Sequence, residues 1–226
     1  MTWRILAAAV VVALLLYWQL IIAEGAYLGQ KVVTLLYDRV AHKYNSIKAF
    51  DAQDERDFLG APLIQALGNS FTEIVLDVAT GTGRLPAAIL QQPHFRGTVI
   101  GVDHSARMLA QAQKIGLSLT LVQADAMRLP FACNAVQGVT CLEALEFLPD
   151  PQGGLRELVR VLSPNGVLLT TRRTGWETIL MPGKTWPEDK LRAILNQLPL
   201  AEISIIPWQD IYQQVWARKQ QVANNP

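Results

Sequence analysis

The chain has 226 residues, of which 50% are hydrophobic and 17% are charged, and its formal net charge is +1. This length suits one sizeable domain with an appendage, and the near-neutral charge does not suggest an electrostatic partner such as nucleic acid. Two cysteines and three histidines lie scattered along the chain, so we expect neither a disulfide framework nor a metal site.

An apolar segment opens the sequence, and from Ile5 to Ala23 its only strongly polar residue is Gln19. As a helix, residues 3–23 would span roughly 31 Å, against about 30 Å for the hydrocarbon core of a bilayer. A cleaved signal peptide is the alternative, but its apolar region is shorter, and Ile21 would stand where the cleavage site requires a small residue. We therefore predict that residues 1–26 form a transmembrane anchor.

The basic residues around this segment predict its orientation. Only Arg4 precedes it, whereas Lys31, Arg39 and Lys43 follow it. Because loops on the cytoplasmic side are enriched in Lys and Arg, we expect a single-pass membrane protein whose larger part faces the cytoplasm.

A helical segment and one larger domain are predicted after the anchor. Apolar residues recur at helical spacing through residues 27–48, which indicates an amphipathic helix in a segment covering residues 27–60. Residues 61–226 then alternate between strand and helix patterns. Strands are expected at 74–78, 98–103, 117–122, 135–141, 167–171, 203–206 and 211–219, with helices at 84–91, 105–114, 153–162 and 188–197. This order predicts the α/β class, with a doubly wound, mostly parallel sheet of seven strands.

A glycine turn follows the first of these strands. The apolar run 74–78 contains Asp77 and leads through Ala79-Thr80-Gly81-Thr82-Gly83 into a helix that starts at Arg84. Glycines let the backbone approach a ligand closely, and the helix start offers free N–H groups. We expect a small polar molecule to bind here, at the carboxyl edge of the sheet. A dinucleotide-binding motif would have a third glycine, but Pro86 occupies that position.

Aspartates stand at or just after the ends of the next two strands. Asp103 ends the strand 98–103, where a carboxylate can accept hydrogen bonds from a ribose diol, and Asp125 follows the strand 117–122. Their places in the pattern predict that both lie at the same edge of the sheet as the glycine turn.

Four stretches in this order resemble the class I S-adenosylmethionine-dependent methyltransferases of the ubiquinone/menaquinone type. They are Tyr37–Asn45, the Asp77–Gly83 turn, Gly101–Leu109 and Asp125–Phe131, and the resemblance covers roughly residues 37–219. It implies S-adenosylmethionine as the cofactor, with Asp103 on the ribose, Asp125 on the adenine amine, Ala126 against the ring and the segment 37–45 as a cover. The predicted cofactor-binding residues are Asp77, Ala79, Thr80, Gly81, Gly83, Asp103, His104, Met108, Asp125, Ala126 and Thr140.

The chain departs from the family pattern at three positions. Ala79 replaces a glycine, Phe147 a histidine and Asn134 an aspartate, so no acid or base carries over from relatives. If the reaction needs a base, Glu143, Tyr44 and Tyr37 are the candidates.

The resemblance predicts an enzyme that methylates a small acceptor. The anchor favours a lipophilic acceptor, such as a quinone precursor, and the irregular stretch with Trp176, Met181 and Trp186 would line its pocket or enter the membrane interface. Two alternatives remain open at this point, a nicotinamide-dependent oxidoreductase and a non-catalytic membrane-tethered binding module.

Overall fold

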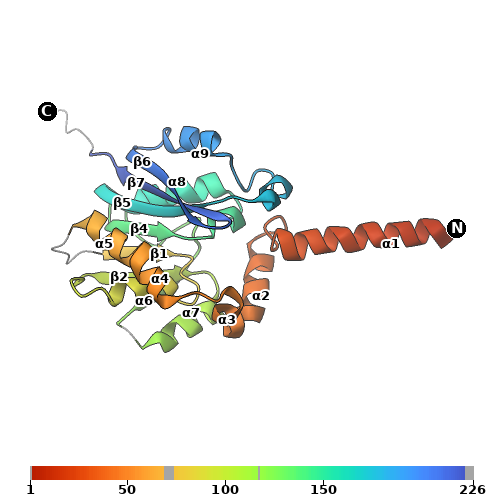
Figure 1. Ribbon diagram of the computed structural model, residues 1–226, viewed down its shortest axis with the longest axis horizontal. Coiled ribbons are helices and arrows are strands. Elements are labelled where there is room, and N and C mark those ends of the chain that lie inside the picture. The colour runs from red at the N-terminus through yellow and green to blue at the C-terminus, as the bar shows by residue number, and fades with distance from the viewer. Residues whose placement is uncertain (1, 69–73, 117, 222–226) are drawn as a thin grey trace.

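The computed structural model describes residues 2–68, 74–116 and 118–221, which form an α/β domain with one long helix projecting from it (Figure 1). The helical elements are α1 (Thr2–Tyr17), η1 (Trp18–Ile22), α2 (Gln30–Val40), η2 (Ala41–Lys43), α3 (Tyr44–Lys48), α4 (Ala52–Glu55), η3 (Arg56–Gly60), α5 (Ala61–Leu67), α6 (Arg84–Leu90), α7 (Ala106–Ala112), η4 (Gln113–Ile115), η5 (Leu145–Phe147), α8 (Pro151–Val161), η6 (Trp176–Leu180) and α9 (Glu188–Leu195). The strands are β1 (Ile74–Val78), β2 (Thr98–Asp103), β3 (Thr120–Gln123), β4 (Val136–Cys141), β5 (Leu162–Arg173), β6 (Leu200–Gln209) and β7 (Tyr212–Lys219).

The strands form one seven-stranded sheet in the order β3-β2-β1-β4-β5-β7-β6. The first five strands in this order pair in parallel, and β7 runs antiparallel to both of its neighbours. This confirms the predicted mostly parallel sheet. In the register, Asp77 of β1 lies opposite Gly101 of β2 on one side and Thr140 of β4 on the other, so the carboxyl ends of the central strands align.

Apolar side chains cover both faces of the sheet, as its continuous apolar strands require. Successive residues of β1 point to opposite faces. Val75 belongs to one buried cluster with Leu63 of α5 and Ile89 of α6, whereas Leu76 belongs to another with residues of α8 and α9. Leu59 joins the first cluster, so the segment before residue 60 packs directly on the domain.

Several predicted elements differ from the observed ones in their bounds, among them β6, which spans Leu200–Gln209 where a strand at 203–206 was expected. The helix expected over 27–48 is divided into α2, η2 and α3; η2 lies against α7, and its Ala41 is buried. Helix α8 ends at Val161, and β5 begins at Leu162 instead of Val167. The residue before a proline favours an extended backbone, and Ser163 stands directly before Pro164, so the helix cannot continue through it. Strand β3 begins at Thr120, and Leu117, where we expected it to start, lies outside the described residues.

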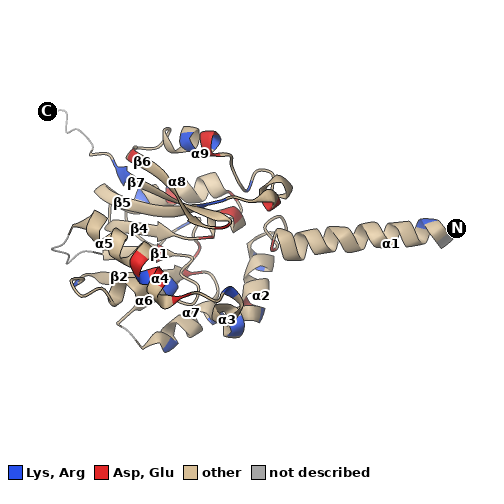
Figure 2. Ribbon diagram, viewed as in Figure 1, with Lys and Arg blue, Asp and Glu red and all other residues tan. Residues whose placement is uncertain are grey.

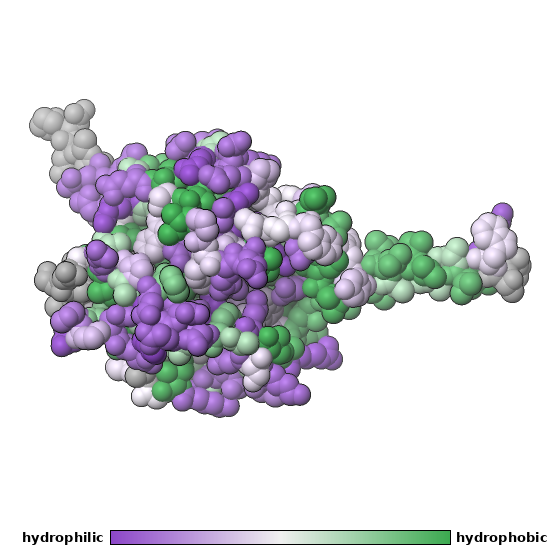
Figure 3. Space-filling model, viewed as in Figure 1, coloured by the Kyte–Doolittle hydropathy of each residue, from purple (hydrophilic) through white to green (hydrophobic). Residues whose placement is uncertain are grey.

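Helix α1 and the π-helical turn η1 continue one another and project away from the domain (Figure 1). Residues Trp3–Ile22 are long and apolar enough to cross a membrane: the most apolar 18-residue window among them has a mean hydropathy of 2.6, and none of it is buried in the protein. Charged residues appear on this helix only near its free end (Figure 2). The hydrophobic surface runs along the helix and continues onto the domain at its base (Figure 3).

Candidate functional site

A cavity of about 100 Å³ lies at the carboxyl ends of β1, β2, β3 and β4, and α2 covers it. A second cavity of about 40 Å³ adjoins the first and shares part of its wall. The residues common to both walls are Tyr44, Ala79, Gly81, Leu142 and Glu143. The two cavities form one elongated site across the centre of the sheet edge.

The glycine turn borders this site through Gly81. Gly81 has φ +56°, and a Cβ added there would meet nothing within 4 Å, so the turn exposes open space where a ligand can contact the backbone. Gly83 differs, because a Cβ on it would lie 2.6 Å from Ile115 Cδ1. Gly83 therefore allows close packing against η4. Ala79 also adopts a left-handed conformation, with φ +57°, which costs an alanine roughly 1 kcal/mol or more compared with glycine.

Asp103 fixes the turn from the end of β2. Its Oδ2 accepts a hydrogen bond of 2.8 Å from the Gly81 amide, and its Oδ1 accepts one of 2.8 Å from the Ser105 amide. Burial raises the pKa of the Asp103 carboxyl. Each carboxylate oxygen keeps a lone pair for a further donor, so Asp103 can still bind ligand hydroxyls while it holds Gly81.

Three polar contacts join the segment 30–45, which covers the site, to residues that follow the ends of β1 and β2. The Thr34 hydroxyl lies 2.9 Å from His104 Nδ1. Asp38 accepts a hydrogen bond from the Ser105 hydroxyl, and Asn45 Oδ1 accepts one of 2.6 Å from the Thr82 hydroxyl. Tyr37 and Tyr44 line the cavity, and Ala41 between them is buried. Of the residues that define the Tyr37–Asn45 resemblance, Tyr37 and Tyr44 therefore line the site, whereas Asp38 and Asn45 bind residues at the ends of the strands.

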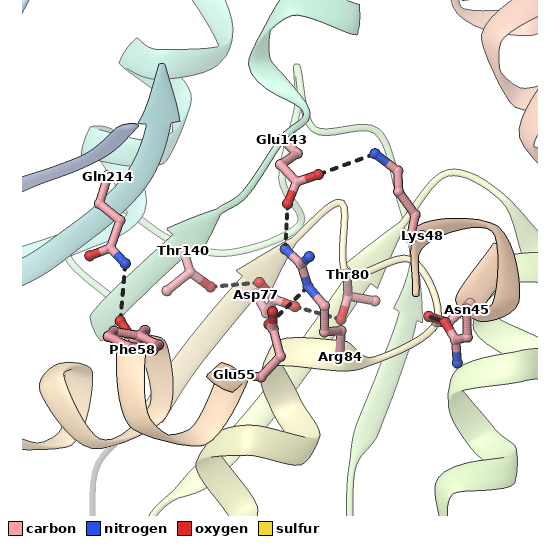
Figure 4. Close-up of polar contacts among 11 residues, drawn as sticks. Asn45, Lys48, Glu55, Phe58, Asp77, Thr80, Arg84, Thr140, Glu143 and Gln214 are labelled. Carbon is pink, nitrogen blue, oxygen red and sulfur yellow. Dashed lines mark hydrogen bonds and ion pairs between the residues drawn. The ribbon is translucent and has the colours of Figure 1, made fainter. Parts of the chain in front are cut away.

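Asp77 is a buried carboxylate of β1, next to the glycine turn. It is only 3% exposed, and its two oxygens accept hydrogen bonds of 2.6 Å from the hydroxyls of Thr80 and Thr140 (Figure 4). Burial raises the pKa of this carboxyl to about 6, although the two hydroxyls lower it. Asp77 borders only the smaller cavity.

We expect the Asp77→Asn variant to lose part of the pH dependence of folding stability. A carboxyl whose pKa is raised by folding stabilises the protein fully below its unfolded pKa, near 4, and this contribution disappears as pH rises through about 6. The free energy of unfolding of the wild type should therefore fall by about 2–3 kcal/mol relative to the variant between pH 4 and 7. Denaturant unfolding at several pH values measures this difference, and parallel profiles for the two proteins would contradict it.

A network of charged side chains closes the smaller cavity. The Arg84 guanidinium lies between two carboxylates, with Nε 3.1 Å from Glu55 Oε2 and Nη2 2.9 Å from Glu143 Oε1 (Figure 4). Lys48 Nζ is 3.3 Å from the other Glu143 oxygen, and the Arg84 guanidinium carbon lies 3.9 Å from the centre of the Phe50 ring. Burial raises the pKa of Glu55 to about 7. The sequence did not assign Arg84, Glu55 or Lys48 to the site.

The structure brings together most of the predicted cofactor-binding residues. Ala79, Gly81, Asp103, His104, Met108 and Ala126 line the main cavity, and Asp77 and Thr80 line the smaller one. Gly83, Asp125 and Thr140 line neither. Asp125 is exposed and accepts a hydrogen bond of 2.8 Å from the Met127 amide, so its contact with adenine stays a prediction.

Sequence reasoning missed several residues of the cavity wall. They are Gln30, Val33, Thr34, Val102, Ser105, Ala124, Ala144 and Leu148, in addition to Leu142. A signal was present on α2, where the polar residues Gln30 and Thr34 share one helical face with Tyr37.

Comparisons with known proteins agree with this geometry. The family described as "Methyltransferase domain" matches residues 76–170. A demethylmenaquinone methyltransferase from Lactobacillus johnsonii is 30% identical over 164 residues, which cover 66% of this chain and 67% of that protein. The ubiquinone/menaquinone biosynthesis C-methyltransferase UbiE from Desulfotalea psychrophila is 32% identical over 136 residues, covering 59% of this chain and 55% of that protein.

A solved structure shows the same fold. The S-adenosylmethionine-dependent methyltransferase from Aquifex aeolicus superposes with a TM-score of 0.59 at 19% identity, covering 75% of this chain and 99% of that one. The sequence left three functions open. The sequence relatives are methyltransferases, so they support methyl transfer and favour neither an oxidoreductase nor a non-catalytic module. The chain belongs to the S-adenosylmethionine-dependent methyltransferases.

Proposed function

We propose that this methyltransferase acts at a membrane surface on a small lipophilic acceptor of the quinone-precursor type. The observation that carries the proposal is the direct connection between the apolar helix and the wall of the cavity. Directly after η1, Ala26 packs in one buried cluster with Val33, Phe147 and Met181. Val33 and Phe147 also line the cavity, so the turn that follows the apolar helix packs on two residues of the cavity wall.

The residues at the sheet edge fit the cofactor. Asp103 is placed to accept hydrogen bonds from the ribose, and the small side chains of Ala124 and Ala126 leave space for the adenine beside β3. Open space beside Gly81 accommodates the part of the cofactor that follows the ribose. S-adenosylmethionine supplies a methyl group already activated on a sulfonium, so the protein's main tasks are to orient the acceptor and exclude water.

The cover of the site can perform both tasks. Tyr37 and Tyr44 are partly buried, and desolvation raises the pKa of each phenol above its usual value. These hydroxyls therefore stay protonated at neutral pH and act as hydrogen-bond donors, not as general bases.

Glu143 remains the candidate base, since its carboxylate borders the main cavity, with one oxygen on Arg84 and the other beside Lys48.

Contacts at the base of the apolar helix support the membrane location. The Trp18 indole N–H donates to the Leu180 carbonyl at 2.9 Å, and the Tyr27 hydroxyl donates to the Pro182 carbonyl at 2.8 Å. These bonds hold η6 beside the helix, where Trp176 is 63% exposed and Ile179 is 80% exposed. Exposed aromatic and apolar side chains at the end of an apolar helix suit the membrane interface.

The stretch that we expected to contact the acceptor or the membrane divides into two parts. Trp176 faces solvent, whereas Trp186 packs against the core of the sheet and Met181 is fully buried. The interfacial role is therefore proposed for Trp176 and Ile179. The anchor is proposed to place the domain on the cytoplasmic side, in agreement with the basic residues that follow it.

Methyl transfer in isolated membranes tests the proposed function. Membranes that contain the protein are supplied with S-adenosylmethionine labelled in the methyl group and then extracted with organic solvent. We expect label in the lipid extract for the wild type, and a loss of about tenfold or more for Asp103→Ala at limiting cofactor, because charge-assisted hydrogen bonds contribute roughly 1.5–3 kcal/mol each. Label that appears only in protein or water-soluble molecules would contradict a lipophilic acceptor.

A further inference from the structure

Arg84 has one buried donor without a partner among the described residues. Its Nη2 donates a hydrogen bond to Glu143 and its Nε lies at ion-pair distance from Glu55 Oε2, but Nη1 is inaccessible to solvent and has no hydrogen-bond acceptor. A buried charged donor left unpaired is costly, so such a group indicates a missing acceptor. Arg84 lines the smaller cavity together with Gly81 and Tyr44.

The order of the strands shows which part of the cofactor reaches this cavity. The inference rests on the proposed placement of the ribose at Asp103 on β2. With adenine beside β3, the other end of the cofactor must point toward β1 and β4, because the strands follow the order β3-β2-β1-β4. The smaller cavity lies there, between the glycine turn and Leu142. That end of S-adenosylmethionine is an amino acid, whose carboxylate is the strongest hydrogen-bond acceptor of the molecule.

We infer that Arg84 binds the carboxylate of the cofactor's methionine part through Nη1. The guanidinium is held in place before the ligand arrives, because Glu55 and Glu143 fix two of its nitrogens and Phe50 packs against its plane. Lys48 adds a second positive charge beside Glu143, which offsets the carboxylates near the incoming anion. Arg84 is thus a cofactor-binding residue that selects a ligand with an amino-acid carboxylate.

The test compares two ligands that differ only in this group. S-adenosylmethionine and decarboxylated S-adenosylmethionine are titrated calorimetrically into the full-length protein in detergent. We expect Arg84→Met to weaken S-adenosylmethionine binding by roughly 10- to 100-fold and to change the affinity for the decarboxylated compound by less than about threefold. Arg192→Met serves as a control, since Arg192 forms an exposed ion pair with Glu188 on α9 and should affect neither ligand.

A second variant keeps the test valid if the methionine variant does not fold. Arg84→Lys retains a charge beside the two carboxylates but loses the fork of donors, and it should weaken only the carboxylated ligand, by a smaller factor. Equal weakening of both ligands, or unchanged binding of S-adenosylmethionine, would overturn the assignment. A wild-type protein that binds neither ligand would instead contradict the cofactor placement on which the inference depends.

Discussion

The Gly81→Val variant is expected to bind no measurable S-adenosylmethionine. Gly81 has φ +56°, and the space that its Cβ would occupy holds no protein atom, because it belongs to the cavity. A valine there would place three carbons where the cofactor passes the turn. It would also strain the backbone by about 1–3 kcal/mol and disturb the amide that Asp103 holds. Calorimetric titration should show at least a hundredfold loss of affinity.

Gly116→Val is a matched control for this prediction. Gly116 also has a positive φ, +72°, and an added Cβ there likewise meets nothing within 4 Å, but the residue borders neither cavity. Valine should impose a similar backbone strain at both positions, so only the block of the cavity differs. If Gly81→Val bound the cofactor as well as Gly116→Val does, the turn would not form part of the cofactor site.

Removal of residues 1–17 is expected to move the protein from the membrane fraction to the soluble fraction. Residues 3–17 are exposed along their whole length, so their loss should leave the domain folded. Cofactor affinity should stay within about twofold, because Gln30 and the residues that follow it remain in place. Sedimentation of cell extracts and titration of the soluble protein measure the two results.

The position of the cut matters for this experiment. Removal of residues 1–26, the full predicted anchor, would also delete Ala23 and Ala26, which are buried, and Glu24, whose Oε2 accepts a 2.8 Å hydrogen bond from the Tyr37 hydroxyl. We expect this longer deletion to weaken cofactor binding by loosening α2. A protein without residues 1–17 that still sediments with membranes would contradict the anchor.

Local patterns were sufficient to predict the strands and the turn that carry the site. The apolar run 74–78, the glycines after it and the strand 98–103 with Asp103 at its end each depend on neighbouring residues, and β1 and β2 were observed at the expected positions. Parallel strands bring their carboxyl ends to one edge, so the meeting of Asp103 with Gly81 followed from the fold class.

Contacts between distant segments could not be predicted in this way. Arg84 looked like the first residue of a helix, yet its partners Glu55 and Glu143 come from the segments before β1 and after β4. Thr140 was expected at the cofactor, but its side chain is fully buried and donates to Asp77. Which side of a strand end faces the ligand depends on packing that no short motif encodes.

The division of the chain at residue 60 stays a prediction, and the packing of Leu59 with Leu63 and Val75 places the two segments in direct contact.

Amide hydrogen exchange with and without S-adenosylhomocysteine tests most directly whether the cofactor binds beneath α2. The ligand should slow exchange in residues 79–83, in 103–108 and in α2, because these segments line the site and are joined by the contacts from Asp103, Thr34 and Asp38. Exchange in α9, which does not border the cavity, should stay unchanged. Protection confined to another surface, such as the groove beside Ile206–Gln214, would contradict the account.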